Sequence, residues 1–131
     1  MEITFDFREE HSRLFGKIKR PVVPVIMSNG DKQEAGTFYV DSGADISLIP
    51  RTTGKRLGFT IEKEDIREVK GIGERGIPIL IRKLKLQIGD KEINAEVAWS
   101  LVEEVPLLLG RKDVFDNFEI TFKDNKTIFR Y

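Results

Sequence analysis

Asp41 is the residue of this sequence whose neighbours best suit acid–base chemistry. An apolar, β-prone run over residues 38–40 leads into it, and Ser42, Gly43 and Ala44 follow. A strand would hold the carboxylate in place, the glycine permits a tight turn, and the serine hydroxyl can hydrogen-bond to nearby groups. Asp, Ser and Gly are also common in ordinary turns. Taken alone, the stretch leaves a functional site and a plain turn equally open.

Other chemical groups are scarce in this sequence. The chain has no cysteine, which excludes disulfides, thiolate zinc sites and cysteine nucleophiles. Its single histidine, His11, stands between Glu10 and Ser12, where a solvated loop residue is expected rather than the base of a Ser-His-Asp hydrolase. Histidine-rich metal sites are excluded as well. Carboxylates remain as the acid–base groups, and we expect neither a metal nor a cofactor.

The composition indicates a single domain over residues 1–131. Lys plus Arg and Asp plus Glu both number 22, so no basic field favours nucleic acid or an anionic membrane. No apolar run approaches the ~20 residues needed to span a bilayer. Residues 1–7 alternate and carry acidic side chains, unlike a signal peptide, and we expect a cytoplasmic protein.

Patterns typical of β-strands dominate the chain. Alternating or continuous apolar residues predict strands near 3–7, 18–27, 34–40, 47–50, 79–88, 93–99, 107–109, 118–122 and 127–131, with a weaker pattern at 61–69. Turn residues recur between them, most clearly at Asn29-Gly30. Residues 8–16 are charged and irregular, residues 51–57 suit one or two helical turns, and residues 111–116 suit a short helix. The pattern predicts an all-β barrel or sandwich.

A glycine-rich stretch at residues 71–76 matches the G-x-G-x-x-G pattern of dinucleotide-binding proteins. That pattern must open a helix, whereas residues 77–81 contain proline and β-branched side chains. Nucleotide binding is therefore disfavoured. Glycines between two strands instead suit the tip of a hairpin that folds over a ligand. An ordinary surface hairpin is the alternative interpretation.

Three features stand in one order along the chain: Asp-Ser-Gly-Ala-Asp at 41–45, the glycine-rich hairpin at 71–76, and Leu-Leu-Leu-Gly-Arg at 107–111. This order resembles the retropepsins, the single-domain aspartic proteases of retroviruses and their cellular relatives. The resemblance covers about residues 34–120. It implies a closed, barrel-like all-β fold with one short helix after Leu-Leu-Gly-Arg.

The resemblance also implies roles for individual residues. Asp41 would be the catalytic aspartate, Ser42 would hydrogen-bond across to the loop of a partner chain, and Gly43 would present its backbone to the substrate. Ala44 and Asp45 would also contact the substrate.

Further residues would close and support such a site. Gly71, Ile72 and Gly73 would form the flap tip, and Leu108 would wall the substrate pocket. Beneath the site, Gly110 and Arg111 would support it, with Arg111 pairing with Asp45. If that pair is buried, losing one partner would cost roughly 3–5 kcal/mol.

An aspartic protease needs two carboxylates in contact, and this chain has one Asp-Ser-Gly. The second must come from another copy, which predicts a C2 homodimer with the site on its axis. The chain departs from the viral pattern in three ways: about forty residues precede Asp41, the flap carries Glu74 and Arg75, and the C-terminal hairpin is longer than a single terminal strand. Because of the third difference, the viral dimer sheet is not assumed for this chain.

Two functions fit these features. The leading hypothesis is a homodimeric aspartic endopeptidase acting on extended peptide or protein substrates, without nucleic acid or membrane partners. The alternative is a non-catalytic peptide- or protein-binding module with the same fold. The intact residues at 41–43 favour the enzyme.

Overall fold

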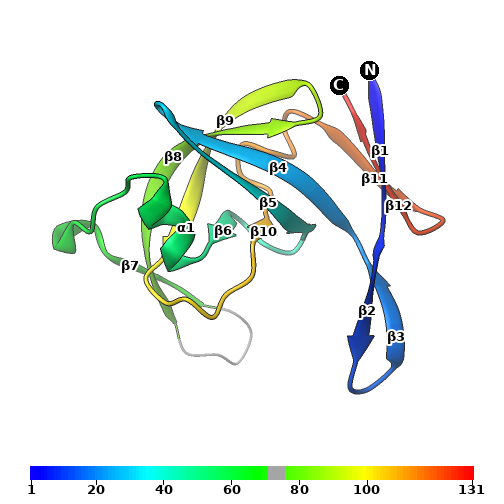
Figure 1. Cartoon of the computed structure of the whole chain (residues 1–131), viewed down its shortest axis with the longest axis horizontal. Helices are drawn as coiled ribbons and strands as arrows, with labels where there is room; N and C mark the ends of the chain where they lie inside the picture. Colours follow the sequence, from blue (N-terminus) through cyan, green and yellow to red (C-terminus); the bar gives the residue numbers. More distant parts are fainter. Residues whose placement is uncertain (71–75) are drawn as a thin grey trace.

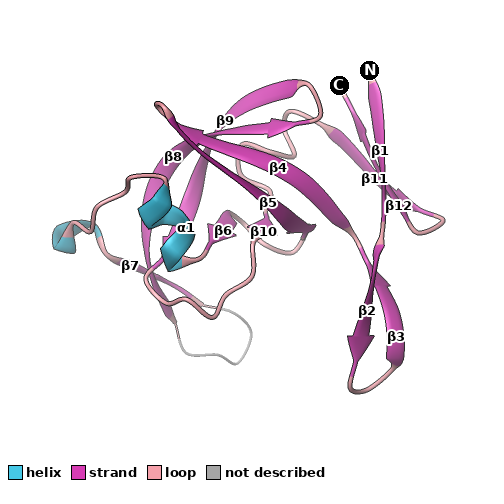
Figure 2. Cartoon of the chain, in the orientation of Figure 1, coloured by secondary structure: helices cyan, strands magenta, loops and turns pink. Residues whose placement is uncertain are grey.

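The computed structural model describes residues 1–70 and 76–131, and strands make up most of them (Figures 1 and 2). The strands are β1 (Glu2–Asp6), β2 (Arg8–Ser12), β3 (Gly16–Arg20), β4 (Val22–Asn29), β5 (Lys32–Val40), β6 (Ser47–Ile49), β7 (Arg67–Val69), β8 (Ile77–Ile88), β9 (Lys91–Ser100), β10 (Leu108–Leu109), β11 (Glu119–Lys123) and β12 (Lys126–Arg130). The helices are α1 (Arg51–Arg56) and a 3-10 turn, η1 (Lys63–Asp65). Within the described ranges, neither has the length and apolar character that crossing a bilayer requires.

Six strands close into a barrel. Their order is β4-β5-β10-β6-β9-β8, and β8 pairs back onto β4, while β7 extends the sheet beyond β8. Most neighbours are antiparallel, but β10 runs parallel to β5 and β6 runs parallel to β9. The predicted closed, all-β architecture is therefore confirmed.

The barrel core contains the inward faces of these strands. In β8, Leu84, Leu86 and Ile88 are buried, as their alternation with polar residues predicts. The largest side chain, Trp99 of β9, is fully buried and donates a hydrogen bond of 3.0 Å from Nε1 to the carbonyl of Arg51. This contact holds α1 against the barrel.

Both ends of the chain lie in a separate three-stranded sheet with the order β1-β12-β11 (Figure 1). The ammonium group of Met1 donates to the carbonyl oxygen of Tyr131 at 2.7 Å. Phe5 and Phe118 pack edge-on against the buried ring of Phe129, which joins this sheet to the core. The last strand, β12, is the central strand of its sheet.

Residues 8–16 do not form the irregular segment that the sequence predicted. They contribute to a two-stranded hairpin of β2 and β3, in which Arg8 lies opposite Arg20. Its side chains are mostly exposed or half-buried, so no apolar alternation marks its strands. The predicted strand over 18–27 is divided at Pro21 between β3 and β4.

The position predicted for the short helix, directly after Leu-Leu-Gly-Arg, was wrong. Residues 112–117 form consecutive turns, in which the N–H groups of Val114 and Phe115 both donate to the carbonyl of Arg111. Asp113, inside these turns, has a φ of 63°, which lies outside the right-handed helical region, so they do not form a regular helix. The one short α-helix of the described residues is α1, where residues 51–57 suited helical turns.

Candidate functional site

Asp41 directly follows β5, at the point where this strand leaves its neighbour β10. The two strands are parallel, with Tyr39 beside Leu108. The Asp41 N–H donates to the carbonyl of Leu109 at 3.0 Å, which continues the strand pairing by one residue. The barrel thus fixes the backbone of a half-buried aspartate at the start of a loop.

The loop after Asp41 turns back onto the aspartate. The Gly43 N–H donates to Asp41 Oδ1 at 2.9 Å, and the Ala44 N–H donates to the Asp41 carbonyl at 3.2 Å. Both interpretations of this stretch are therefore compatible with its local structure: it is a turn, and the turn orients the carboxylate. Ser42 lies exposed beside it.

Backbone groups of residues 110–112 support the loop from below. The N–H groups of Arg111 and Lys112 donate to the carbonyls of Ala44 and Asp45, both at 2.9 Å. The buried Gly110 N–H donates to Ser47 Oγ at 3.0 Å. These hydrogen bonds connect Gly110 and Arg111 to the segment after Asp41, and their role in supporting a site stays a prediction.

Position 110 has no room for a side chain. A Cβ there would lie 2.5 Å from the carbonyl oxygen of Ile46 and 2.9 Å from the backbone nitrogen of Ser47. Real Cβ atoms do not approach backbone so closely, so only glycine lets the two segments meet.

Asp45 and Arg111 form the predicted ion pair, through Asp45 Oδ1 and Arg111 Nη2. Their side chains are 87% and 54% exposed, respectively, so the condition of burial is not met in the isolated chain. The pair belongs to the class of exposed ion pairs, which contribute at most about 1 kcal/mol.

Two cavities meet at Asp41. One, of about 540 Å³, contains Asp41, Gly43, Ala44, Asp45 and Leu108 in its lining. Five of the predicted site residues therefore face one space. The other, of about 520 Å³, shares Asp41 and Leu108 with the first.

The two paired strands that flank the glycine-rich stretch, β7 and β8, border the first cavity. Val69 of β7 pairs with Ile77 of β8, and both residues line the cavity together with Lys70. The predicted flap-tip residues Gly71, Ile72 and Gly73 lie outside the described residues. The flap consequently stays a prediction, whereas the two flanking strands line a cavity with Asp41.

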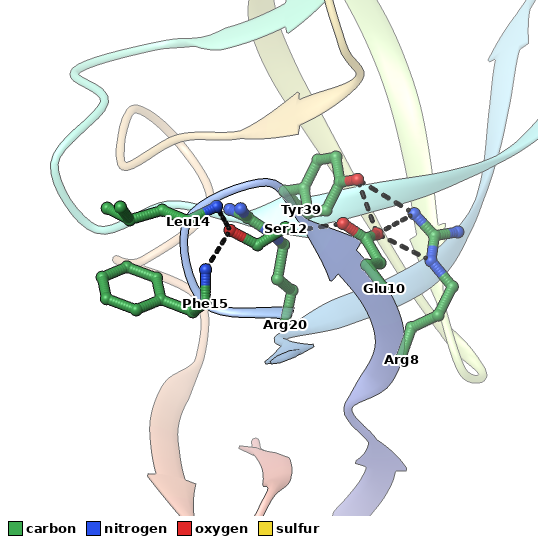
Figure 3. Close-up of polar contacts among 7 residues, drawn as sticks. All are labelled: Arg8, Glu10, Ser12, Leu14, Phe15, Arg20 and Tyr39. Atoms are coloured by element: carbon green, nitrogen blue, oxygen red, sulfur yellow. Dashed lines mark hydrogen bonds and ion pairs between the residues drawn. The ribbon is translucent and has the colours of Figure 1, made fainter. Parts of the chain in front are cut away.

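The second cavity contains residues that the sequence did not single out, Glu10 and Arg20 of the β2–β3 hairpin and Tyr39 of β5. Tyr39 Oη donates to Glu10 Oε2 at 2.6 Å, and Arg20 Nε lies 3.1 Å from Glu10 Oε1 (Figure 3). Arg8 Nη2 donates to the same Glu10 oxygen at 2.8 Å and to Tyr39 Oη at 3.2 Å.

These hydrogen bonds, from Tyr39 first and then from Arg8, hold the pKa of Glu10 below its usual value, because they stabilise the ionised carboxylate. One signal in the sequence could have indicated this network. Tyr39 lies two residues before Asp41, so the two side chains point to the same side of the strand.

The described ranges contain no cluster of side chains that could bind a metal ion. No group of three His, Asp or Glu side chains there is arranged to hold an ion. The groups available around Asp41 are its own carboxylate, backbone N–H groups, an apolar wall, and the polar side chains of Glu10, Arg20, Tyr39, Asp45 and Lys70.

A family model described as aspartyl protease matches residues 23–112. Two solved structures have a similar fold. A retropepsin-like aspartic protease from Rickettsia conorii is 19% identical with a TM-score of 0.66, over 100% of this chain and 91% of that one. EIAV protease complexed with the inhibitor HBY-793 is 20% identical with a TM-score of 0.50, over 71% of this chain and 83% of that one. No curated protein sequence matches the chain.

Proposed function

Since the chain belongs to the retropepsin-like aspartyl protease family, we propose that it is a homodimeric aspartic endopeptidase. Two copies of Asp41, one from each chain, would activate the water that hydrolyses a peptide bond. The observation that carries the proposal is the position of Asp41. Its half-buried carboxylate faces a cavity of about 540 Å³ from a loop fixed by the barrel.

The dimer is proposed because one chain offers one suitable aspartate. Asp45 is the other carboxylate in the described lining of this cavity, and it is paired with Arg111. The Asp45 carboxylate is therefore engaged by a guanidinium of the same chain, which suits support of the loop rather than catalysis. A two-fold axis through the site would bring Asp41 beside the Asp41 of a second copy.

The reaction then follows from two carboxylates in contact. Two like charges so close do not both ionise, so the pair holds one proton. The ionised member takes a proton from water, and the resulting hydroxide adds to the scissile carbonyl carbon. The protonated member donates a hydrogen bond to the carbonyl oxygen. Collapse of the tetrahedral intermediate breaks the C–N bond, and one of the two carboxyl groups, both protonated at this point, gives its proton to the leaving amine, which returns the pair to one proton.

Other residues keep the roles that the resemblance implies. Ser42 would hydrogen-bond across the axis to the partner's loop, and Gly43 would offer its backbone to the substrate. The extended substrate would pair with the flap, as in β-strand addition. Leu108, which lines both cavities, favours cleavage beside apolar side chains.

Incubation with a mixed peptide library between about pH 3 and 7, read by mass spectrometry, tests the proposal. The wild type should cleave, and Asp41→Asn should not, because asparagine cannot accept the water proton. Asp31→Asn makes the same substitution in the exposed β4–β5 turn and should cleave normally. Equal cleavage by wild type and Asp41→Asn would refute the proposal. A dimer without any activity would favour the binding module.

A further inference from the structure

The hairpin of β2 and β3, residues 8–20, extends away from the barrel and is called the arm here (Figure 1). Its tip carries two large apolar side chains in succession, Leu14 and Phe15, which are 80% and 74% exposed. Apart from the N-terminal Met1, at 71%, the other large hydrophobic residues of the described chain are at most 42% exposed. Adjacent apolar residues at the end of a projecting hairpin mark an interaction site rather than scattered surface hydrophobicity.

The tip has a defined conformation. The hydroxyl oxygen of Ser12 accepts hydrogen bonds from the N–H groups of Leu14 and Phe15, both at 3.2 Å (Figure 3). Gly16 follows with a φ of +71°, which few other residues adopt readily. The two apolar side chains are therefore presented on a turn that is already formed, so little conformational entropy is lost when they are covered.

The base of the arm is attached beside Asp41. Tyr39 Oη bonds to Glu10 of the arm, and the Arg8 guanidinium lies 5.4 Å from the centre of the Tyr39 ring. Glu10 and Arg20 line the same cavity as Asp41. Any molecule that reaches Asp41 through this cavity therefore lies against the base of the arm.

We propose that the arm forms the contact between two copies of this chain, with Leu14 and Phe15 of each arm buried against the other copy. The proposal rests on the proposed function, in which the Asp41 side chains of the two copies are in contact. The second copy must occupy the space next to Asp41, and one cavity there is lined by the arm. Two-fold symmetry makes the contact twice, so four large apolar side chains are covered.

In the terminal sheet, β12 is paired on both sides, with β1 and with β11, so β12 itself offers no free edge to another copy, and the outer edges of this sheet belong to β1 and β11. The stem of the arm is rich in charge, with Arg8, Glu9, Glu10, Lys17, Lys19 and Arg20. An apolar centre with a charged periphery is the usual anatomy of a protein–protein contact.

Sedimentation equilibrium of the full chain tests the arm. The double variant Leu14→Ser/Phe15→Ser should raise the dimer Kd by at least about 100-fold, because buried aromatic and aliphatic anchors dominate such contacts. Its circular dichroism and melting temperature as a monomer should match the wild type, since both side chains are exposed. Ile61→Ser, which changes a 39% exposed residue between α1 and η1, should leave Kd unchanged.

A second measurement does not remove the apolar tip. Because the chain has no cysteine, Arg13→Cys carries a single thiol on the same turn for an environment-sensitive fluorophore. Its emission should shift as the protein concentration passes through the dimer Kd. An unchanged emission together with an unchanged Kd for the double variant would overturn the proposal, and so would a wild type that is monomeric at every concentration.

Peptide cleavage by the same samples separates this proposal from the proposed function. A double variant that is monomeric at low concentration and inactive there, but active at high concentration, supports both. A wild-type dimer that does not cleave, with dimerisation lost in the double variant, supports the arm and refutes the peptidase. Cleavage by a dimer that the double variant leaves intact supports the peptidase and refutes the arm.

Discussion

Gly110→Ala should destabilise the protein strongly, because the new methyl group would meet backbone rather than side chains. The Cβ would lie 2.5 Å from the carbonyl oxygen of Ile46 and 2.9 Å from the nitrogen of Ser47. Neither atom can rotate away, so the two segments must separate. The strain of such overpacking is typically about 1–3 kcal/mol.

Separation would also break the hydrogen bonds that hold the loop of Asp41. The N–H groups of Gly110, Arg111 and Lys112 donate across this contact, at 3.0, 2.9 and 2.9 Å. At about 1 kcal/mol for each net hydrogen bond, their loss alone costs about 3 kcal/mol. The folded-to-unfolded ratio would fall more than about 100-fold.

Urea unfolding followed by fluorescence measures this cost, because Trp99 is the single tryptophan and is fully buried. The midpoint should fall by about 1–3 M urea. Gly36→Ala is the matched control. Its Cβ would lie 2.6 Å from Leu107 Cδ1, a methyl group that can move, so its cost should stay under about 1 kcal/mol. Equal midpoints for the two variants would refute the reasoning.

Three further expectations concern the helix, the exposed ion pair and the arm. Gly54→Ala should destabilise by about 1–3 kcal/mol despite the better helix propensity of alanine, because its Cβ would lie 2.5 Å from Trp99 Cε2; a more stable variant in urea would contradict this. Arg111→Ala should cost less than about 1 kcal/mol in thermal unfolding, because its pair with Asp45 is exposed, and a larger loss would show that another copy buries the pair. Hydrogen bonds lower the pKa of Glu10 in the folded state, so its stabilisation is complete above pH 4.5 and is lost as the pH falls through that lowered pKa. Thermal unfolding at several pH values should therefore show a Glu10→Gln deficit near pH 7 that disappears in acid, and a constant deficit would refute it.

Much of the barrel could be predicted because its strands are buried on one face. Alternation in residues 84–88 predicted the buried positions of β8, and Asn29-Gly30 predicted the β4–β5 hairpin. The strands of the arm could not be predicted, because neither strand has a fully buried face. No side chain of its stem is fully buried, and the half-buried positions hold Glu10, Ser12, Gly16 and Ile18, so no run of apolar residues reveals a period.

Local patterns likewise could not predict the turns after Arg111. Residues 111–116 have a composition compatible with a helix, but the Asp113 carboxylate accepts a hydrogen bond of 2.9 Å from the Glu96 N–H of β9. A contact with the barrel strand β9 thus accompanies the positive φ at Asp113. The partner in this contact lies 17 residues away along the chain, so a local pattern does not contain it.

The candidate site divides in the same way. Asp41, Gly43 and Gly110 could be predicted, because each has a chemical or steric requirement that restricts the residue type. The spacing of Tyr39 from Asp41 could have indicated Tyr39, but Glu10 could not be predicted, because its hydrogen bond to Tyr39 joins segments 29 residues apart. Only the fold brings the base of the arm to the cavity of Asp41.

Each chain builds its half of the proposed site without help from the other. The Asp41 N–H bonds to Leu109, its carboxylate accepts from the Gly43 N–H, and the Ala44 carbonyl accepts from Arg111, all within one chain. Joining two such halves requires no refolding at the axis, so association loses mainly rigid-body freedom and the freedom of side chains at the contact. Cleavage should then follow the dimer population, whereas the order of the Asp41 loop should follow the stability of the barrel. Weakening the arm would therefore reduce the number of complete sites without changing the chemistry of those that form.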